Sequence, residues 1–210
     1  GCLRAGQGTL AEGLEEIGHG AFYDCKALTE ITLPASLKKI GKGVFHRNEA
    51  LKKMVVADSD TELSFETSGY NYGTPNMTPA YALDHIYVGR NIVRIDNLSN
   101  SIIAYAKVVE LGEKVTSLGQ LMPGTGNVSD IYVPWTTPIE QTEDICKGNY
   151  GDITLWVPGG TKEAYQAADI WKKFTKMNHH STLVTLTAST HGTIAGHTLT
   201  TQPQLTTQAT

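Results

Sequence analysis

A stretch of 23 residues near the N-terminus of the chain is repeated, almost in register, directly after itself. Moving 23 positions along the sequence carries Leu14 onto Leu37, Ile17 onto Ile40, Gly18 onto Gly41, Gly20 onto Gly43, Phe22 onto Phe45, Leu28 onto Leu51 and Ile31 onto Met54. A unit this short cannot bury its own apolar side, so it gains stability only by stacking on its neighbours. The repeat therefore predicts an elongated stack of coils.

Apolar residues recur at positions one, four, six, ten and thirteen of each unit. The fourth unit follows this pattern in full, with Leu83, Ile86, Val88, Ile92 and Ile95. Units begin at residues 5, 28, 51, 83, 106, 128 and 152. A period of roughly 20 to 29 residues is typical of a leucine-rich-repeat solenoid. We therefore expect about seven degenerate units over residues 1–177, forming a right-handed solenoid with a parallel β-sheet on one face and short helical or irregular returns.

The repeat also predicts which side chains point inward and which point outward. Positions four and six should face the core, because alternate residues of a strand lie on the same side. Position five then forms an outward column of Thr9, Thr32, Val55, Tyr87, Glu110, Tyr132 and Trp156. Position three forms a second column of Gln7, Glu30, Lys53, His85, Val108, Asp130 and Thr154. Gly18 and Gly41 follow the isoleucine of position thirteen, where we expect a turn with positive φ.

Two segments depart from the repeat. Residues 64–82 fill the longer gap between the third and fourth units, and their Tyr, Asn, Gly, Thr and Pro content predicts a loop or irregular hairpin. Residues 161–174 predict a helix with Thr161 as its N-cap and Ala164, Ala168 and Trp171 on one face. We expect this helix to be the C-terminal cap that covers the last open coil.

Residues 178–210 differ in composition from the solenoid. Apolar and polar residues alternate on both sides of a His-Gly-Thr turn, which predicts a β-hairpin. A lone hairpin is barely stable in water. This segment therefore docks on the solenoid, forms a tail, or begins a further β domain.

Composition excludes several classes of function. The formal net charge of −4 argues against a nucleic-acid or anionic-membrane partner, and no apolar run is long enough for a membrane span. The chain has no recognisable catalytic motif and no motif for a cofactor. Its seven histidines are not spaced as a convergent ligand set, so we expect no metal site.

Cys2 and Cys25 occupy the same position of successive units, 23 residues apart. They are interpreted first as two small buried residues stacked on neighbouring coils. A disulfide between the coils and a lipid-carrying role for Cys2 are the alternatives. Cys146 has no partner that the repeat identifies, and the odd number of cysteines excludes a complete disulfide framework within the chain.

Residues 17–34 read IGHGAFYDCKALTEITLP, and residues 155–174 read LWVPGGTKEAYQAADIWKKF. Both stretches resemble the BspA-type leucine-rich repeat. The resemblance implies a secreted or surface-anchored bacterial protein that acts as an adhesin or protein-interaction module and not as an enzyme. Residues 184–200 are similar to the start of InlB-type B-repeat β domains, which would fit a multidomain surface protein.

The candidate binding residues lie on the outward columns and in the inserted loop. They are Tyr87, Tyr132 and Trp156 at position five, with His85 and Glu110 beside them, and Tyr70 and Tyr72 in residues 64–82. Tyr and Trp combine a large contact area with a polar group, which suits recognition. The alternative is that aromatic residues favour strands in any case, or pack under the C-terminal hairpin.

Three functions are compatible with these features. The first is a non-catalytic extracellular module that binds a protein ligand, such as a host matrix protein or another surface protein. The second is a glycan-binding module of a surface nutrient-capture system that uses the aromatic column. The third is a structural spacer without a specific ligand.

Overall fold

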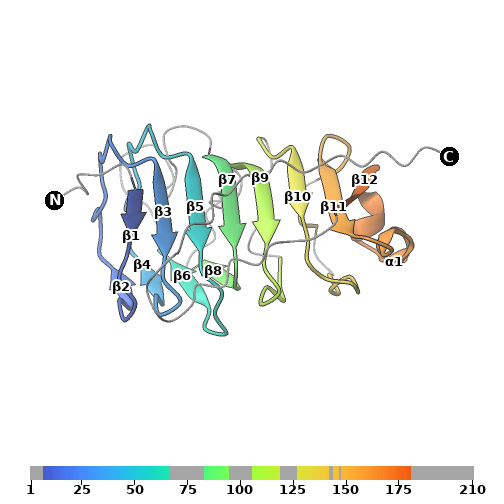
Figure 1. Cartoon of the computed structure of the whole chain (residues 1–210), viewed down its shortest axis with the longest axis horizontal. Coiled ribbons are helices and arrows are strands. Elements are labelled where there is room, and N and C mark those ends of the chain that lie inside the picture. The colour runs from blue at the N-terminus through green and yellow to red at the C-terminus, as the bar shows by residue number, and fades with distance from the viewer. Residues whose placement is uncertain are drawn as a thin grey trace, which may run out of the picture.

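The computed structural model describes residues 7–66, 83–94, 106–118, 127–141, 144–146 and 148–180. Within these residues the chain forms a stack of coils with an eight-stranded sheet along one side (Figure 1). The strands are β1 (Gln7–Thr9), β3 (Glu30–Leu33), β5 (Lys53–Val56), β7 (Leu83–Val88), β9 (Ala106–Leu111), β10 (Asp130–Tyr132), β11 (Thr154–Pro158) and β12 (Lys176–His180). Neighbouring strands pair in parallel in this order. The expected parallel solenoid is confirmed, and each of the seven expected units supplies one strand.

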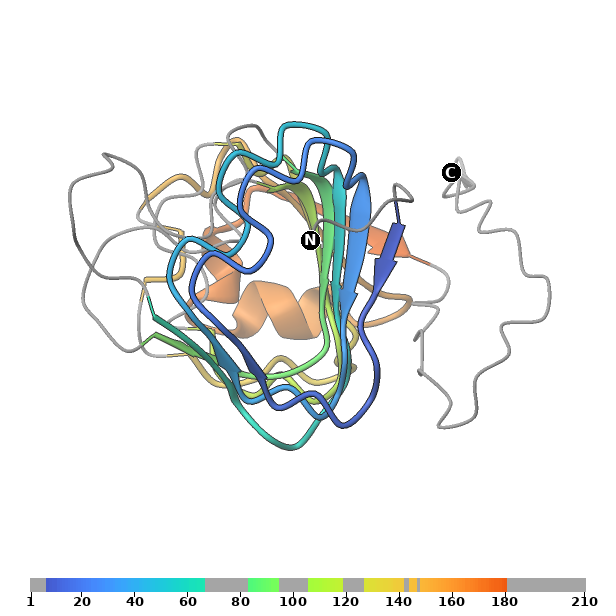
Figure 2. The same cartoon turned by 90° about the vertical axis from the view of Figure 1, so that its left-hand side faces the viewer.

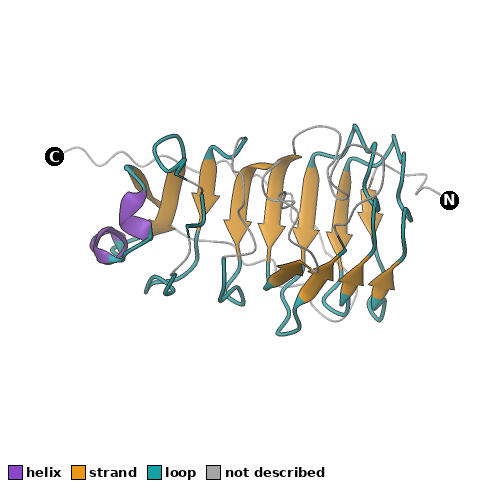
Figure 3. Ribbon diagram, turned by 180° about the vertical axis from the view of Figure 1, so that it is seen from behind, coloured by secondary structure: helices purple, strands orange, loops and turns teal. Residues whose placement is uncertain are grey.

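A second, smaller parallel sheet takes one strand from each of the first four coils, after the first turn of that coil (Figure 3). Its strands are β2 (Glu16–Ile17), β4 (Lys39–Ile40), β6 (Leu63–Phe65) and β8 (Ile92–Arg94). Phe65 lies opposite Ile40, although the repeat predicts Leu63 at that place. The chain uses two more residues to pass from Val56 to Phe65 than from Leu33 to Ile40, so the pattern shifts in the third unit. Ile95, expected at this place in the fourth unit, lies outside the described residues.

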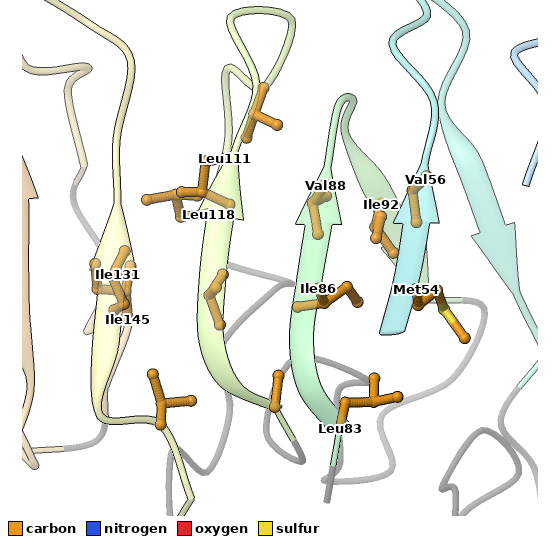
Figure 4. Packing of buried hydrophobic residues seen from close by; sticks show 14 of the residues in the cluster. Met54, Val56, Leu83, Ile86, Val88, Ile92, Leu111, Leu118, Ile131 and Ile145 are labelled. Atoms are coloured by element: carbon orange, nitrogen blue, oxygen red, sulfur yellow. The ribbon is translucent and has the colours of Figure 1, made fainter. Parts of the chain in front are cut away.

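The core lies between the main sheet and the returning chain. Position four supplies one buried side chain from each of the six strands β3, β5, β7, β9, β10 and β11, and all of these are at most 1% exposed: Ile31, Met54, Ile86, Val109, Ile131 and Leu155. Met54, Ile86 and Ile131 lie at the same level of the sheet (Figure 4). Each such side chain contributes about 1.5–3 kcal/mol by leaving water. The alternation inferred from the sequence therefore holds through the sheet.

Hydrogen bonds between the first two returns also join the coils, on the side away from the main sheet. Gly20 N–H donates to the Lys42 carbonyl at 2.8 Å. The same backbone hydrogen bond recurs twice more between the two returns, each time two residues further along both of them. The Phe22 and Phe45 rings stack with their centroids 5.8 Å apart. In Figure 2, viewed along the stack, successive coils nearly superimpose. The returns thus repeat as regularly as the strands in this part of the chain.

The two glycines of each return have structural roles that differ from the role expected from the sequence. Positive φ occurs at Gly20 and Gly43, with values of 63° and 64°, so the expectation of positive φ at Gly18 and Gly41 is wrong. A Cβ on Gly41 would lie 2.8 Å from the backbone nitrogen of His19 on the preceding coil. Glycine is therefore required at Gly41 for close packing of two backbones, and at Gly43 for its left-handed conformation.

The C-terminal region differs from the expected helical cap. Helix α1 (Lys162–Ala167) is short, and the backbone is extended at Ala168 before the 3₁₀ turn η2 (Trp171–Lys173). Strand β12 then pairs with β11, so α1 and η2 are the return of another coil and not a cap. The expected continuous helix over residues 161–174 is wrong because the chain must turn back to supply that strand.

Side chains of this last return still close the end of the core. The residue of α1 that is buried is Tyr165, whereas Ala164 is exposed, so the expected apolar face is wrong at Ala164. Ala168 and Trp171, the other two residues of that face, do pack in the core. Thr161 is the N-cap residue, but its hydroxyl donates to the Pro158 carbonyl at 2.8 Å instead of capping the helix. The Tyr165 hydroxyl and the Trp171 indole N–H donate to carbonyls of the preceding coil at 2.8 and 2.9 Å.

Two further expectations concern the chain ends. Strand β12 crosses the domain boundary expected between residues 177 and 178, and the hairpin expected after it lies outside the described residues.

Cys25 is disulfide-bonded, so its interpretation as an unbonded buried residue is wrong. Cys2 lies outside the described residues. Cys146 is buried, which raises the pKa of its thiol to about 12.

Arg90 is a fully buried cation that ties together coils that are not adjacent. Its guanidinium donates hydrogen bonds to the carbonyls of Ala35 at 3.0 Å and Leu37 at 2.8 Å, and to that of Pro34. Arg90 follows β7 in the fourth unit, whereas its acceptors follow β3 in the second. The side chain thus satisfies three buried carbonyls across the intervening coil, and burial lowers its pKa.

Replacing Arg90 with methionine is expected to lower the free energy of unfolding by about 3 kcal/mol, because buried carbonyls lose their donors. Chemical denaturation monitored by circular dichroism measures this change. The matched control is Arg47→Met, since Arg47 is exposed, and its effect should stay within about 0.5 kcal/mol. Equal unfolding midpoints for the two variants would show that Arg90 does not tie the coils together.

Candidate interaction surface

The candidate surface is the outer face of the main sheet, opposite the core. The register places Val55 beside Tyr87, Tyr87 beside Glu110, Glu110 beside Tyr132, and Tyr132 beside Trp156. Both columns therefore pair in the register that the sequence predicts. Strand β12 extends them with Lys176 at position three and Asn178 at position five. Sequence reasoning missed this strand, although Phe174 and Met177 occupy positions one and four of a further unit.

Tyr87 does not belong to an exposed aromatic column, because it is only 1% exposed. Its hydroxyl donates to Asp58 Oδ1 at 2.8 Å. A Cβ on Gly112 would lie 2.6 Å from the Tyr87 hydroxyl oxygen, so this glycine leaves the space that the phenol occupies. Burial, followed by the hydrogen bond to Asp58, raises the pKa of Tyr87. Glycine at position seven of the fourth and fifth units, which leaves space for Asp58 and for the Tyr87 phenol, was the sequence signal for this arrangement.

Tyr132 and Trp156 form the centre of the remaining surface, and are named here the Tyr132–Trp156 pair. Their rings are stacked, with centroids 5.3 Å apart and planes 2° from parallel. The Trp156 indole N–H donates to Asp130 Oδ1 at 2.7 Å, and the Ser129 hydroxyl donates to Asp130 Oδ2 at 2.7 Å. The carboxylate is thereby held at the edge of the pair. Both rings are half-buried, so part of each remains open to a partner.

His85 and Glu110 lie next to the pair on β7 and β9. The ring nitrogen Nε2 of His85 is 3.0 Å from Glu110 Oε2, so the two candidate residues contact each other. Glu110 in turn lies opposite Tyr132 in the register. Burial raises the pKa of Tyr132, and the charges of Asp130 and Glu110 raise it further. The phenol therefore stays protonated at neutral pH and can donate a hydrogen bond to a ligand.

His180, at the end of β12, completes this surface and was not predicted as part of it. Its ring centroid lies 6.0 Å from that of Tyr132, and its Nε2 is 3.0 Å from the Val133 carbonyl oxygen. The side chain thus reaches from the last strand across β11 to β10. It fixes one border of the Tyr132–Trp156 pair.

The inserted segment contributes less to the described structure. Residues 64 and 65 belong to β6, so the expected loop begins inside a strand. Tyr70 and Tyr72, the other candidate residues, lie outside the described residues. The structure therefore brings together His85, Glu110, Tyr132 and Trp156. Tyr87 lies beside Glu110 in the register but is buried, so it offers no surface to a partner.

The chemistry available at this surface is that of recognition. It offers ring edges, one open phenol and two carboxylates. Across the part of the chain that the structure describes, no group of three or more His, Cys, Asp or Glu side chains is placed to hold a metal ion. Within the same residues, no helix is both long and apolar enough to cross a membrane.

Comparison with known proteins agrees with the repeats seen in the fold. The parallel-strand solenoid fits a leucine-rich-repeat type. Residues 1–73 match the family model described as BspA type Leucine rich repeat region (6 copies). This match does not extend to residues 184–200, so the similarity to an InlB-type domain stays a prediction. No curated protein matches the chain.

Replacing Tyr87 with phenylalanine is expected to lower the free energy of unfolding by about 1–2 kcal/mol. The substitution removes the hydroxyl donor from Asp58, whose Oδ2 already has no hydrogen-bond partner among the described residues. Denaturant titration measures the difference. Tyr23→Phe is the control, because Tyr23 is 46% exposed. If both variants unfold at the same denaturant concentration, Tyr87 does not make a structural contact of this kind.

Proposed function

We propose that this chain is a non-catalytic protein-interaction module of a secreted or surface-anchored bacterial protein. It binds a protein partner through the outer face of strands β9–β12. The observation that carries this proposal is the Tyr132–Trp156 pair, which places two half-buried rings and an oriented carboxylate on an otherwise regular sheet. Aromatic side chains of this kind dominate the binding energy of many protein interfaces.

The repeat family supports the same function. Residues 1–73 match BspA-type repeats, and such repeats are thought to serve as surface interaction modules. A solenoid suits this role because its stacked strands present one side chain from each unit at a constant spacing. Residues can then vary on the outer face without disturbing the core.

The disulfide of Cys25 supports a location outside the cytoplasm. Disulfides form and persist in oxidising compartments and are rare in the bacterial cytoplasm. Cys25 is buried, and its backbone N–H donates to Asn48 Oδ1 at 2.7 Å. The Asn48 side chain thus joins the return that holds the bonded cysteine to the next coil.

Thiol labelling tests this location. The native chain is purified from its own cells and unfolded with an alkylating reagent in the absence of reductant. Cys25 should then remain unlabelled. After reduction, Cys25 should be labelled in full, and peptide mass spectrometry distinguishes the two results. Full labelling of Cys25 without reductant would contradict an oxidising location.

A glycan ligand is the second candidate, and the same residues motivate it. Aromatic residues bind sugars by exposing a ring face to the sugar ring. In the Tyr132–Trp156 pair, one face of each ring is covered by the other ring. Each ring therefore has at most one open face, which fits a single side chain of a protein partner better than a row of stacked sugars.

Binding assays with a double variant, Tyr132→Ala with Trp156→Ala, test the proposed function. Immobilised matrix proteins and a glycan array are each probed with the wild-type chain and with this variant. We expect saturable binding to a protein ligand and at least a tenfold loss of affinity in the variant, because both rings leave the interface. Tyr23→Ala, on the return side, should bind as the wild type does.

Circular dichroism first establishes that the double variant is folded. Protein binding that is unchanged in this variant would contradict the proposed surface. Loss of glycan-array binding, without any protein ligand, would favour the glycan function. Binding to neither class by the wild-type chain would favour a structural spacer.

A further inference from the structure

We infer that the Tyr132–Trp156 pair is a subsite for a cationic side chain of the partner, and that arginine is its preferred occupant. This inference rests on the proposed function, because it names the chemistry that the same surface recognises. Three features carry it: a carboxylate without a cationic partner, an indole ring polarised by that carboxylate, and a short neighbour beside the ring.

Asp130 carries a negative charge that no cation of the described chain neutralises. Among the described residues, its two oxygens accept hydrogen bonds from the Trp156 indole and the Ser129 hydroxyl, both of which are neutral donors. Asp130 differs in this respect from carboxylates such as Glu15 and Asp84, which form bridges with Lys38 and Lys107. The Asp130 carboxylate is therefore positioned to receive a cation from the partner.

The indole of Trp156 is suited to receive such a cation. Cations are attracted to the negative faces of aromatic rings, and Trp is the strongest of these sites. A carboxylate that accepts the indole N–H places negative charge at the ring edge, which adds to this attraction. The register puts Tyr132 on one side of Trp156 and Asn178 on the other. Asn178 is short and exposed, so it leaves room for a flat group against the second face of the indole.

The shape of this space favours arginine over lysine. A guanidinium is planar and can continue the stack formed by the two parallel rings, whereas an ammonium is a compact point charge. Glu110 adds a second carboxylate on the other side of Tyr132, and this carboxylate contacts the His85 ring. The nearest opposing charge in the register is Lys176, two strands from Asp130. Removing that lysine should therefore strengthen binding.

The test uses two small probes of nearly identical shape, N-acetyl-arginine amide and N-acetyl-citrulline amide. Citrulline keeps the length and planarity of arginine but carries no charge. Each is titrated into the isotope-labelled full chain while the indole N–H signal of Trp156 is followed by NMR. The Trp156→Phe variant assigns that signal among the three tryptophans. We expect a saturable shift with arginine, and binding of citrulline at least about fivefold weaker.

Substitutions then separate the charge from the packing. Asp130→Asn is isosteric and keeps an acceptor for the indole, and it should weaken arginine binding about threefold to fivefold. Lys176→Gln should strengthen it about twofold. Asp169→Asn removes a carboxylate that lies on the last return and pairs with Lys172, so it should leave binding unchanged.

Several outcomes would overturn the inference. Equal binding of the arginine and citrulline probes, or no effect of Asp130→Asn on arginine binding, would show that charge is not recognised. A shift with methyl glucoside but not with arginine would favour a sugar at this position. If partner binding still depends on Tyr132 and Trp156 while arginine fails to bind, the proposed function stands and only the cationic subsite falls.

Discussion

The parallel register of the main sheet is the constraint on which the rest of the structure depends. Each strand pairs with the equivalent residues of the next unit, so Ile31, Met54 and Ile86 follow one another inside the core. Because side chains alternate across a strand, a slip of one residue would move every buried side chain to the outer face. The same pairing that closes the core therefore also decides which residues meet outside it.

This constraint leaves the outer face free to differ along the stack. The first three units present the small side chains of Thr9, Thr32 and Val55 at position five. The next four units carry three aromatic rings and one carboxylate at the same position, and their contacts cross from strand to strand. Regular repeats and specific chemistry are thus separated along the solenoid. The best-preserved units supply the scaffold, and the surface that supports a function lies toward the C-terminal coils.

Much of this arrangement follows from the sequence, and the exceptions have physical causes. Strand positions and outward columns follow from apolar spacing because that spacing is the packing requirement itself. The burial of Tyr87 depends on contacts with Asp58 and Gly112, which lie on other coils, and the apolar spacing does not reveal it. The 161–174 helix was overestimated because local propensity favours it, whereas pairing of β12 with β11 requires the chain to turn. His180 joins the surface only through that missed strand.

The most direct test of this account is a nuclear Overhauser measurement on the outer face of the folded chain. The ring protons of Tyr132 and Trp156 should give strong cross-peaks, since their centroids are 5.3 Å apart. Trp156 should also show contacts with Asn178, its neighbour in the register on the other side. Cross-peaks from the Trp156 indole to the buried methyl groups of Ile131, with none to Tyr132, would contradict the register and with it the proposed surface.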